Sequence, residues 1–262
     1  MKFGIFADAH YALKTYADRH CHDSIGKLEE AIGIFNNAGL SFVVNMGDSI
    51  DGDPDKDVEL GYLQKVSDTL SNMHNPLHVV IGNHDLATLT KEEYLEYASS
   101  HNSDRYYSFD RGGFHFMILD GNFNEDGSDF SAGNFSWDRC FVPGQQLAWL
   151  KADLEVSEAR PKVIFIHENL DNRLYEGALD PHVIKNHREI RTVLENAGNV
   201  AAVFQGHCHT GRYAIIKSIH YITLSALVVG PGRQNNAFAV VELNKDGGIE
   251  VEGYGRQISF SL

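Results

Sequence analysis

The chain has 262 residues, of which 43% are hydrophobic and 22% are charged. These proportions are typical of a folded soluble protein and argue against a disordered or collagen-like chain. The formal net charge is −14 at pH 7, which argues against nucleic acid or an anionic membrane as a partner, because both require a basic surface. A small anionic substrate is compatible with this charge, because bound cations can dominate the field of a site.

The sequence also predicts one domain and a compartment. No apolar run approaches the roughly 20 residues that span a bilayer. The first apolar segment leads directly to Asp8, a candidate site residue that removal of a signal peptide would delete. The cysteines Cys21, Cys140 and Cys208 are odd in number and widely spaced, which is typical of reduced thiols. We therefore expect a cytoplasmic protein and, since no repeat or linker interrupts the sequence, a single domain over residues 1–262.

Five apolar segments have the length and β-branched content of buried strands. In chain order, we expect these strands at 3–7, 42–46, 77–81, 163–166 and 200–204. Side chains that can bind a metal follow each of them: Asp8 and His10, Asp48, Asn83, His167, and His207 with His209. Because open α/β sheets bind their ligands beyond the carboxyl ends of the strands, we expect these side chains to converge.

Helical and irregular segments connect and follow the strands. Apolar spacing predicts helices at 24–35, 58–73 and near 183–197, and another that begins at 144. Thr90 and Glu93 predict a capping box that begins a short helix. Residues 106–109 and 114–119 predict a hairpin, and the chain from 212 onward is strand-like, with hairpins around 218 and 245–248. Residues 121–143 are a long connection rich in polar and aromatic residues, which we expect to be an insertion loop near the site.

The strand-end side chains form a set of carboxylate, amide and imidazole ligands: Asp8, His10, Asp48, Asn83, His167, His207 and His209. This set suits Mn, Fe or Zn better than Ca or Mg, and it lacks the thiolates of a structural zinc site. Seven ligands are too many for one tetrahedral ion and suit two. The i and i+2 spacing of Asp8 with His10 places both on one side of an extended backbone. Asp48 is the natural bridge between two ions about 3.5–4 Å apart, which can share a hydroxide and clamp the oxygens of an in-line displacement at phosphorus.

Four further residues have candidate roles in catalysis or phosphate binding. His84, facing a dinuclear centre, can protonate the leaving oxygen as a general acid. Asp51 can orient that imidazole from three residues beyond Asp48. Arg19 and Arg212 are candidate phosphate contacts, because a guanidinium fork fits phosphate oxygens. A solvated surface position for both arginines is equally compatible with the sequence.

Two features suggest contacts with a nucleotide but have a plain structural alternative. The aromatic side chains of residues 121–143 can stack on a nucleobase, or they can anchor the loop to the core. Cys208 can line the substrate pocket or simply pack inside the fold.

The motifs occur together in one order along the chain. They are Asp-x-His at 8–10, Gly-Asp-x-x-Asp-Gly at 47–52, Gly-Asn-His-Asp at 82–85, the single His167, and Gly-His-x-His at 206–209. This set resembles the calcineurin-like metallophosphoesterase superfamily over residues 3–209. Within it, the chain is similar to the manganese-dependent ADP-ribose/CDP-alcohol diphosphatase family in segments 19–20, 47–52, 106–109, 144–150, 236–238 and 253–256. At His10 the chain follows the broader superfamily, whereas the diphosphatase family is expected to have glutamine.

The resemblance implies an α/β fold of four layers, α/β/β/α, with two packed mixed sheets. It implies that one metal ion is held by Asp8, His10 and His209, that the other is held by Asn83, His167 and His207, and that Asp48 bridges them. It also implies a small phosphorylated substrate, a nucleoside diphosphate linked to a sugar or an alcohol, that is hydrolysed at the phosphoanhydride.

Other activities on the same motifs stay open at this point. One is a phosphodiesterase that acts on cyclic nucleotides or glycerophosphodiesters, and another is a phosphomonoesterase. A binding protein that has lost catalysis on this fold is less favoured, because every expected ligand and His84 are present.

Overall fold

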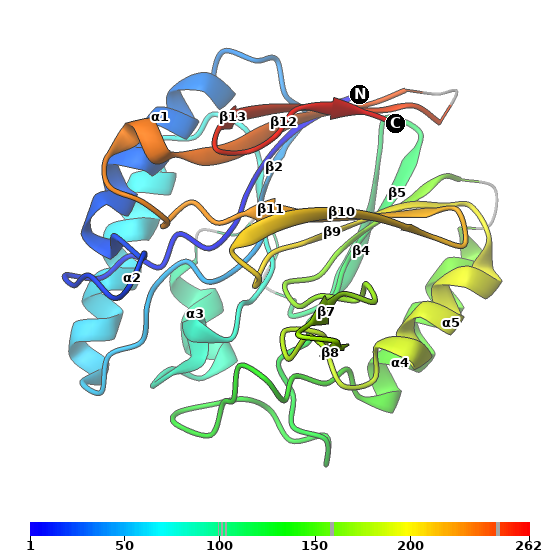
Figure 1. The fold of residues 1–262 in the computed structure, drawn as a ribbon, viewed down its shortest axis with the longest axis horizontal. Helices are drawn as coiled ribbons and strands as arrows, with labels where there is room; N and C mark the ends of the chain where they lie inside the picture. Colours follow the sequence, from blue (N-terminus) through cyan, green and yellow to red (C-terminus); the bar gives the residue numbers. More distant parts are fainter. Residues whose placement is uncertain (99, 101, 103, 158–159, 245–246) are drawn as a thin grey trace.

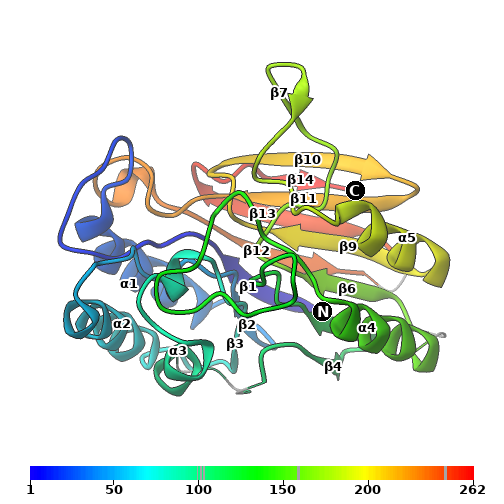
Figure 2. The same cartoon turned by 90° about the horizontal axis from the view of Figure 1, so that it is seen from below.

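Two six-stranded mixed sheets face each other at the centre of the computed structural model, which describes residues 1–262 except 99, 101, 103, 158–159 and 245–246. Three helices lie beside one sheet and two beside the other (Figures 1 and 2). The four-layer α/β/β/α arrangement expected from the resemblance is therefore confirmed.

The first sheet has the strand order β14-β13-β12-β1-β2-β3. Its strands are β1 (Lys2–Phe6), β2 (Val43–Asn45), β3 (Leu77–Val79), β12 (Ala237–Leu243), β13 (Ile249–Gly255) and β14 (Phe260–Ser261). The strands β1, β2 and β3 run parallel, whereas β12 pairs with β1 antiparallel. The carboxyl ends of the three parallel strands consequently meet at one edge.

The second sheet has the order β10-β11-β9-β6-β5-β4. Its strands are β4 (Tyr107–Arg111), β5 (Phe114–Ile118), β6 (Lys162–Phe165), β9 (Val200–Gln205), β10 (Thr210–Ile216) and β11 (Ile219–Ser225). The strands β5, β6, β9 and β11 are parallel, and β4 and β10 are the antiparallel edges. Lys217 and Ser218 have positive φ in the turn between β10 and β11, where a hairpin was expected.

Alternating side chains of β1 serve the two sides of the first sheet. Phe3 points between the sheets, where its ring centroid lies 5.6 Å from those of Phe165 and Phe204 of the second sheet. Phe6 belongs instead to the core under the helices, as does Phe35. Both apolar clusters are built from side chains with almost no exposed area, so the strand ends stand on a rigid base.

The helices α1 (Ser24–Phe35), α2 (Lys56–Leu70) and α3 (Lys91–Tyr97) lie beside the first sheet, and α4 (Gly144–Val156) and α5 (His187–Ala197) lie beside the second (Figure 1). The expected capping box is present, with Thr90 and Glu93 bonded reciprocally. The second helix begins two residues earlier than predicted, because the Asp55 side chain accepts from the Asp57 backbone N–H. None of the helices in the described ranges combines the length and apolarity of a membrane span.

Shorter elements complete the fold. They are the 3₁₀ turns η1 (Cys21–Asp23), η2 (His84–Leu86) and η3 (Arg233–Asn235), and the small hairpin β7 (Leu174–Tyr175) with β8 (Ala178–Leu179). Figure 2 shows this hairpin projecting from the body of the molecule. The hairpin predicted at 245–248 includes residues 245 and 246, which lie outside the described residues. The strands on either side of it, β12 and β13, do pair antiparallel.

Residues 121–143 contain no regular helix or strand and lie against the body of the protein through buried side chains. Phe123 and Phe130 are 7% and 0% exposed, so these two rings anchor the segment. Lys91 of α3 is 1% exposed and pairs with Asp120 at 2.7 Å and with Asp129 at 2.9 Å, across the start of the segment.

Candidate metal centre

The strand-end side chains predicted to bind metal converge at one edge of the two sheets. Two groups of potential ligand atoms each lie within 4.8 Å of one another, one formed by Asp8, His10 and His209 and the other by Asp48, His167 and His207. Asp48 links the groups, because its Oδ2 lies 3.3 Å from Nε2 of His10 and 3.3 Å from Nε2 of His167. This is the position that a carboxylate between two cations requires.

Several of these residues have backbone angles in the left-handed region, which residues other than glycine seldom adopt. The φ angles are 56° at Asp8, 44° at His10, 52° at Asp48 and 66° at His207. The expectation that Asp8 and His10 share a side of an extended backbone is therefore wrong, although both do reach the same centre. Such strain persists only where the surrounding structure holds it, and it concentrates at functional sites.

Two glycines allow the loops after β2 and β3 to touch. A Cβ on Gly82 would lie 2.1 Å from the backbone nitrogen of Asp48, and one on Gly47 would lie 2.6 Å from the backbone nitrogen of Gly82. Asp85, fully buried, ties the same loops together by accepting from the backbone N–H groups of Asp48 at 3.0 Å and of Gly82 at 2.9 Å. Sequence reasoning missed this role, although Asp85 ends the Gly-Asn-His-Asp motif.

The donor set fits divalent transition metals, as a test of its hydrogen bonds shows. Asn83 is fully buried, and neither polar atom of its side chain has a hydrogen-bond partner among the described residues. Asp8 Oδ2 and His167 Nε2 are likewise without such a bond. Nε2 of His10 and Nε2 of His209 face each other at 3.2 Å. Buried polar atoms left in this state are costly, and cations held by the two groups would satisfy the oxygen and imidazole lone pairs among them.

Two of the histidines are held by backbone carbonyls through the ring nitrogen that faces away from the centre. Nδ1 of His167 donates to the carbonyl of Met46 at 2.8 Å, which leaves Nε2 as the lone pair for a metal. Nε2 of His207 donates to the carbonyl of Trp137 at 3.0 Å, which leaves Nδ1. Such partners orient a metal-binding imidazole, and the Trp137 contact brings the segment 121–143 directly to the centre.

Burial controls the charges of the ligands. It raises the pKa of the Asp8 carboxyl to about 7, so this group needs a nearby positive charge to stay ionised at neutral pH. Burial lowers the pKa of the His207 and His209 imidazoles well below their usual range. Both rings are therefore neutral at pH 7, which is the form that binds a metal.

His84 and Asp51 lie together beside this centre. Nδ1 of His84 is 3.0 Å from Oδ1 of Asp51, and the rings of His84 and His10 are 4.7 Å apart. Burial by itself would lower the pKa of His84, but the charge of Asp48 and the hydrogen bond to Asp51 outweigh it and raise that pKa. Because Nδ1 is held by Asp51, Nε2 is the atom of His84 that is left to exchange a proton with a ligand.

A cleft of about 480 Å³ opens beside His84 and Asp51. Lys14 and Arg19 line it, with Nζ of Lys14 3.0 Å from Asp51 Oδ2 and Nη1 of Arg19 2.9 Å from Asp51 Oδ1. Two aromatic side chains line it as well: Tyr16, whose ring lies 5.0 Å from the Arg19 guanidinium, and Phe135 of the segment 121–143. Of the lining residues, sequence reasoning had identified Arg19, Asp51 and His84 but not Lys14 or Tyr16.

The other two predicted substrate contacts, Arg212 and Cys208, stay predictions. Among the described residues that line the cleft, neither Arg212 nor Cys208 occurs. Nε of Arg212, at the start of β10, is 3.4 Å from Asp171 Oδ2. Cys208 is 9% exposed, and its sulfur lies 3.6 Å from the Thr210 hydroxyl.

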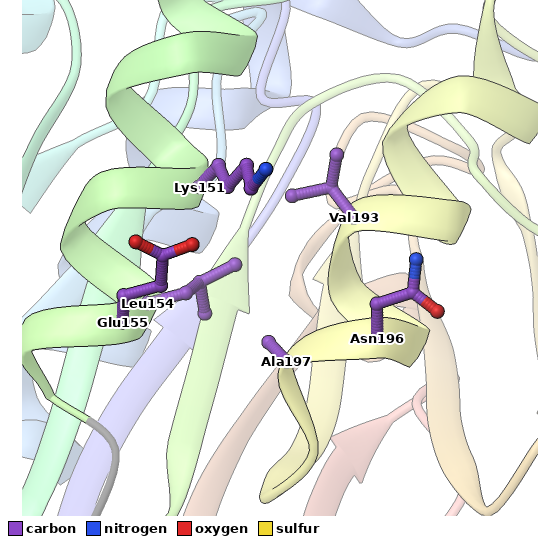
Figure 3. Close-up of a pocket in the computed structure, with 6 residues that line it drawn as sticks. All are labelled: Lys151, Leu154, Glu155, Val193, Asn196 and Ala197. Carbon is purple, nitrogen blue, oxygen red and sulfur yellow. The ribbon is translucent and has the colours of Figure 1, made fainter.

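A separate groove of about 380 Å³ lies between α4 and α5. Figure 3 shows Lys151 and Glu155 of α4 across from Val193 and Asn196 of α5. None of the strand-end residues lines this groove, so it offers no ligand set comparable to that of the metal centre.

Comparison with known proteins agrees with this geometry. The calcineurin-like phosphoesterase family model matches residues 1–211. The manganese-dependent ADP-ribose/CDP-alcohol diphosphatase of Oryza sativa is 27% identical, over 93% of this chain and 88% of its own length. The serine/threonine-protein phosphatase CPPED1 of Mus musculus is also 27% identical, over 83% of this chain and 70% of its own.

A solved structure shows the same fold. The dimetal phosphatase from Danio rerio superposes with a TM-score of 0.84 at 22% identity, covering 99% of this chain and 98% of that one. The family model covers most of the chain and includes every strand-end residue predicted to bind metal. The chain therefore belongs to the calcineurin-like phosphoesterase family and is a metal-dependent hydrolase that uses divalent metal ions.

Proposed function

We propose that this phosphoesterase hydrolyses the phosphoanhydride of a nucleoside diphosphate linked to a sugar or an alcohol. The observation that carries the proposal is the cleft beside the metal centre. Two positively charged side chains, Lys14 and Arg19, and two aromatic side chains, Tyr16 and Phe135, line this cleft together. Lys14 and Arg19 suit the oxygens of a second phosphate, since both present N–H donors. Tyr16 and Phe135 suit the flat or apolar part of a nucleoside or alcohol.

The proposed ligand assignment follows the two groups of side chains. Asp8, His10 and His209 would hold one ion, Asn83, His167 and His207 would hold the other, and Asp48 would lie between them. Bound there, two such ions supply Lewis-acid polarisation of the phosphoryl group and lower the pKa of water. The relatives named diphosphatases support manganese as one metal that serves this role.

The protein's own groups would handle orientation and the leaving group. His84 Nε2 is placed to give a proton to the departing oxygen, because Asp51 holds the opposite ring nitrogen at 3.0 Å. Arg19 and Lys14 contact the same Asp51 carboxylate. A phosphate in the cleft would thus contact the Arg19 and Lys14 side chains, and Asp51 fixes the positions of both relative to His84.

Steady-state kinetics with Mn²⁺ test the substrate class. We expect kcat/KM to be higher for ADP-ribose and CDP-choline than for cyclic AMP, for p-nitrophenyl phosphate and for a phosphoserine peptide. Faster turnover of cyclic AMP or of either monoester would contradict the assignment and favour a phosphodiesterase or a phosphomonoesterase. Lys14→Met should reduce the difference in kcat/KM between the diphosphate substrates and the others, because it removes a charge that only a second phosphate would contact.

A further inference from the structure

A second type of ligand cluster lies next to the metal centre and plays no part in the proposed reaction. Asp180, His182 and Cys208 each offer one ligand atom, and these atoms all lie within 4.8 Å of one another. Asp180 follows β8, and Cys208 lies between His207 and His209. The chain thus brings a carboxylate, an imidazole and a thiol to one place from two segments 26 residues apart.

Local hydrogen bonds hold two of these side chains together. Oδ1 of Asp180 lies 2.7 Å from Nδ1 of His182 and accepts from the His182 backbone N–H at 3.0 Å. The backbone N–H of Asp180 donates to the carbonyl of Arg173 at 3.1 Å. These bonds hold Asp180 and His182 together at the base of the β7–β8 hairpin.

Burial and access suit a bound ion. Asp180 and Cys208 are each 9% exposed, whereas the side chain of His182 is 32% exposed. Ions and water can therefore reach the cluster from the His182 side, while the carboxylate and the thiol are largely shielded. Three protein ligands with water in the fourth position are a usual tetrahedral arrangement for Zn²⁺. The hydroxyl of Thr210, an exposed residue, lies 3.6 Å from the Cys208 sulfur.

The chemistry of this cluster differs from that of the dinuclear centre. The dinuclear set contains oxygen and nitrogen donors only, whereas Cys208 adds sulfur. Thiolate ligands favour softer ions such as Zn²⁺ over Mn²⁺, and a thiol loses its proton when it binds a metal. We propose that Asp180, His182 and Cys208 form a third cation site that prefers a thiophilic divalent ion such as Zn²⁺ or Cd²⁺.

The third site is close enough to the dinuclear centre to affect it. The ring of His182 lies 5.0 Å from that of His207 and 4.9 Å from that of Trp137. Trp137 also holds His207 through its carbonyl. An ion bound by Cys208 and His182 would therefore lie next to the groups that position His207. The proposal stands independently of the substrate class, because it depends on the donor atoms alone.

Cobalt provides a direct readout. Of the proposed sites, only the third contains sulfur, so sulfur-to-cobalt charge-transfer absorption reports it even when Co²⁺ also enters the dinuclear centre. We expect this absorption when the intact protein is titrated with Co²⁺ under reducing conditions. After Mn²⁺ loading and addition of Cd²⁺, elemental analysis should find a third ion per chain.

Variants decide whether the assigned residues bind it. Cys208→Ser and His182→Ala should remove the charge-transfer band and the third ion. Their effect should exceed the roughly 10–100-fold loss in affinity that removal of an orienting partner causes. Cys140→Ser is the matched control, because Cys140 is also buried but belongs to none of the ligand groups of the described residues.

The proposal fails if the wild-type protein shows no sulfur-to-cobalt band, if the band survives in His182→Ala, or if Cys140→Ser abolishes it. Circular dichroism of each variant checks that the fold is intact. If Cys208→Ser does not fold, Asp180→Asn provides a second test from another residue of the cluster. We expect Asp180→Asn to lose the third ion, and retention of that ion would refute the site.

Discussion

Asp51 connects the predicted general acid to the substrate cleft, so its replacement by asparagine is the most informative single change. Oδ1 of Asp51 accepts from Arg19 at 2.9 Å and lies 3.0 Å from Nδ1 of His84, and Oδ2 lies 3.0 Å from Nζ of Lys14. The side chain is only 3% exposed. Asparagine keeps the shape of the group but removes its charge, and it turns one acceptor into a donor that faces other donors.

The hydrogen bond between Asp51 and His84 involves a charged group, and such bonds contribute about 1.5–3 kcal/mol. Since about 1.4 kcal/mol corresponds to a tenfold change in rate, Asp51→Asn should lower kcat about 10–100-fold on a substrate with a basic leaving group. The loss should be much smaller on a p-nitrophenyl phosphodiester, whose leaving oxygen is only weakly basic and needs little help from a proton donor. A general structural defect would lower both rates equally.

Metal content distinguishes positioning from ligation. We expect Asp51→Asn to keep both ions of the dinuclear centre by elemental analysis. Asp57→Asn, at an exposed position at the start of α2 and outside the cleft lining, should have nearly normal kcat. Loss of an ion in Asp51→Asn would place Asp51 in metal binding, either as a ligand or through His10, whose Nδ1 lies 3.4 Å from Asp51 Oδ1. An equal loss of rate on both substrates would refute the role of Asp51 in orienting His84.

Four other outcomes are expected. Chelation should abolish hydrolysis and lower Tm, and Mn²⁺ should reverse both effects, because an ion at 100 times its Kd stabilises the folded state by about 2.7 kcal/mol. Calorimetry with and without chelator would measure the shift in Tm. An unchanged Tm would contradict metal binding by the buried strand-end side chains. Lys14→Met should raise KM for a diphosphate substrate several-fold and leave kcat nearly unchanged. An unaltered KM would contradict the proposed contact between Lys14 and the second phosphate. Gly82→Ala should strongly destabilise the protein, since its Cβ would meet backbone at 2.1 Å. Gly33→Ala in α1 should instead stabilise it by about 0.5–1 kcal/mol, because a Cβ there meets no described atom within 4 Å beyond its chain neighbours and its own helix backbone. Thermal unfolding would reveal a reversed order. Burial raises the pKa of the Cys21 thiol to about 11. Alkylation of Cys21 in the folded protein should therefore be slow at pH 8 and should accelerate as the pH rises toward 11 and more thiolate forms. Complete alkylation of Cys21 at pH 8, measured by mass mapping, would contradict the raised pKa.

The sequence predicted the convergence at the metal centre because each apolar strand changes abruptly to metal-binding residue types. That change places Asp48 and His167 at carboxyl ends of parallel strands, and parallel pairing then brings the ends together. The two-sheet fold and the family could be predicted from the same pattern, because the motifs stand directly after the strands that carry them, and both predictions are confirmed. Element boundaries depended on local capping, as at Asp55.

The local backbone of the centre could not be predicted in this way. Alternation along a strand correctly suggested that Asp8 and His10 reach one place, but their φ angles of 56° and 44° show a tight left-handed path. Residue type gives little information on such angles, because they are imposed by neighbours such as the close contact of Gly82 with Asp48. The small β7–β8 hairpin was also missed, since its two-residue strands are exposed and carry no periodic signal.

Charge alone was likewise insufficient to predict which arginine lies at the cleft. Arg19 and Arg212 looked equivalent in the sequence, yet Arg19 lines the cleft whereas Arg212 pairs with Asp171. What separates them is the partner: Asp51 draws Arg19 toward His84. A carboxylate that already belongs to a site thus selects which cations join it.

The segment 121–143 shows why part of the site is invisible to residue patterns. Its buried rings anchor it, as one reading of the sequence suggested, and Phe135 and Trp137 lie beside His84 and His207. Stacking of these rings on a nucleobase, the other reading, stays a prediction. The contact that matters most to the metal ligands is a backbone carbonyl, that of Trp137 on His207, which any residue at position 137 would supply. Changing the Trp137 side chain alone should therefore affect His207 less than loosening the anchor of the whole segment. Lys91→Met breaks that anchor at Asp120 and Asp129, and we expect it to weaken metal retention more than Trp137→Phe does. The opposite order would place the indole ring, and not the carbonyl, in control of the ligand.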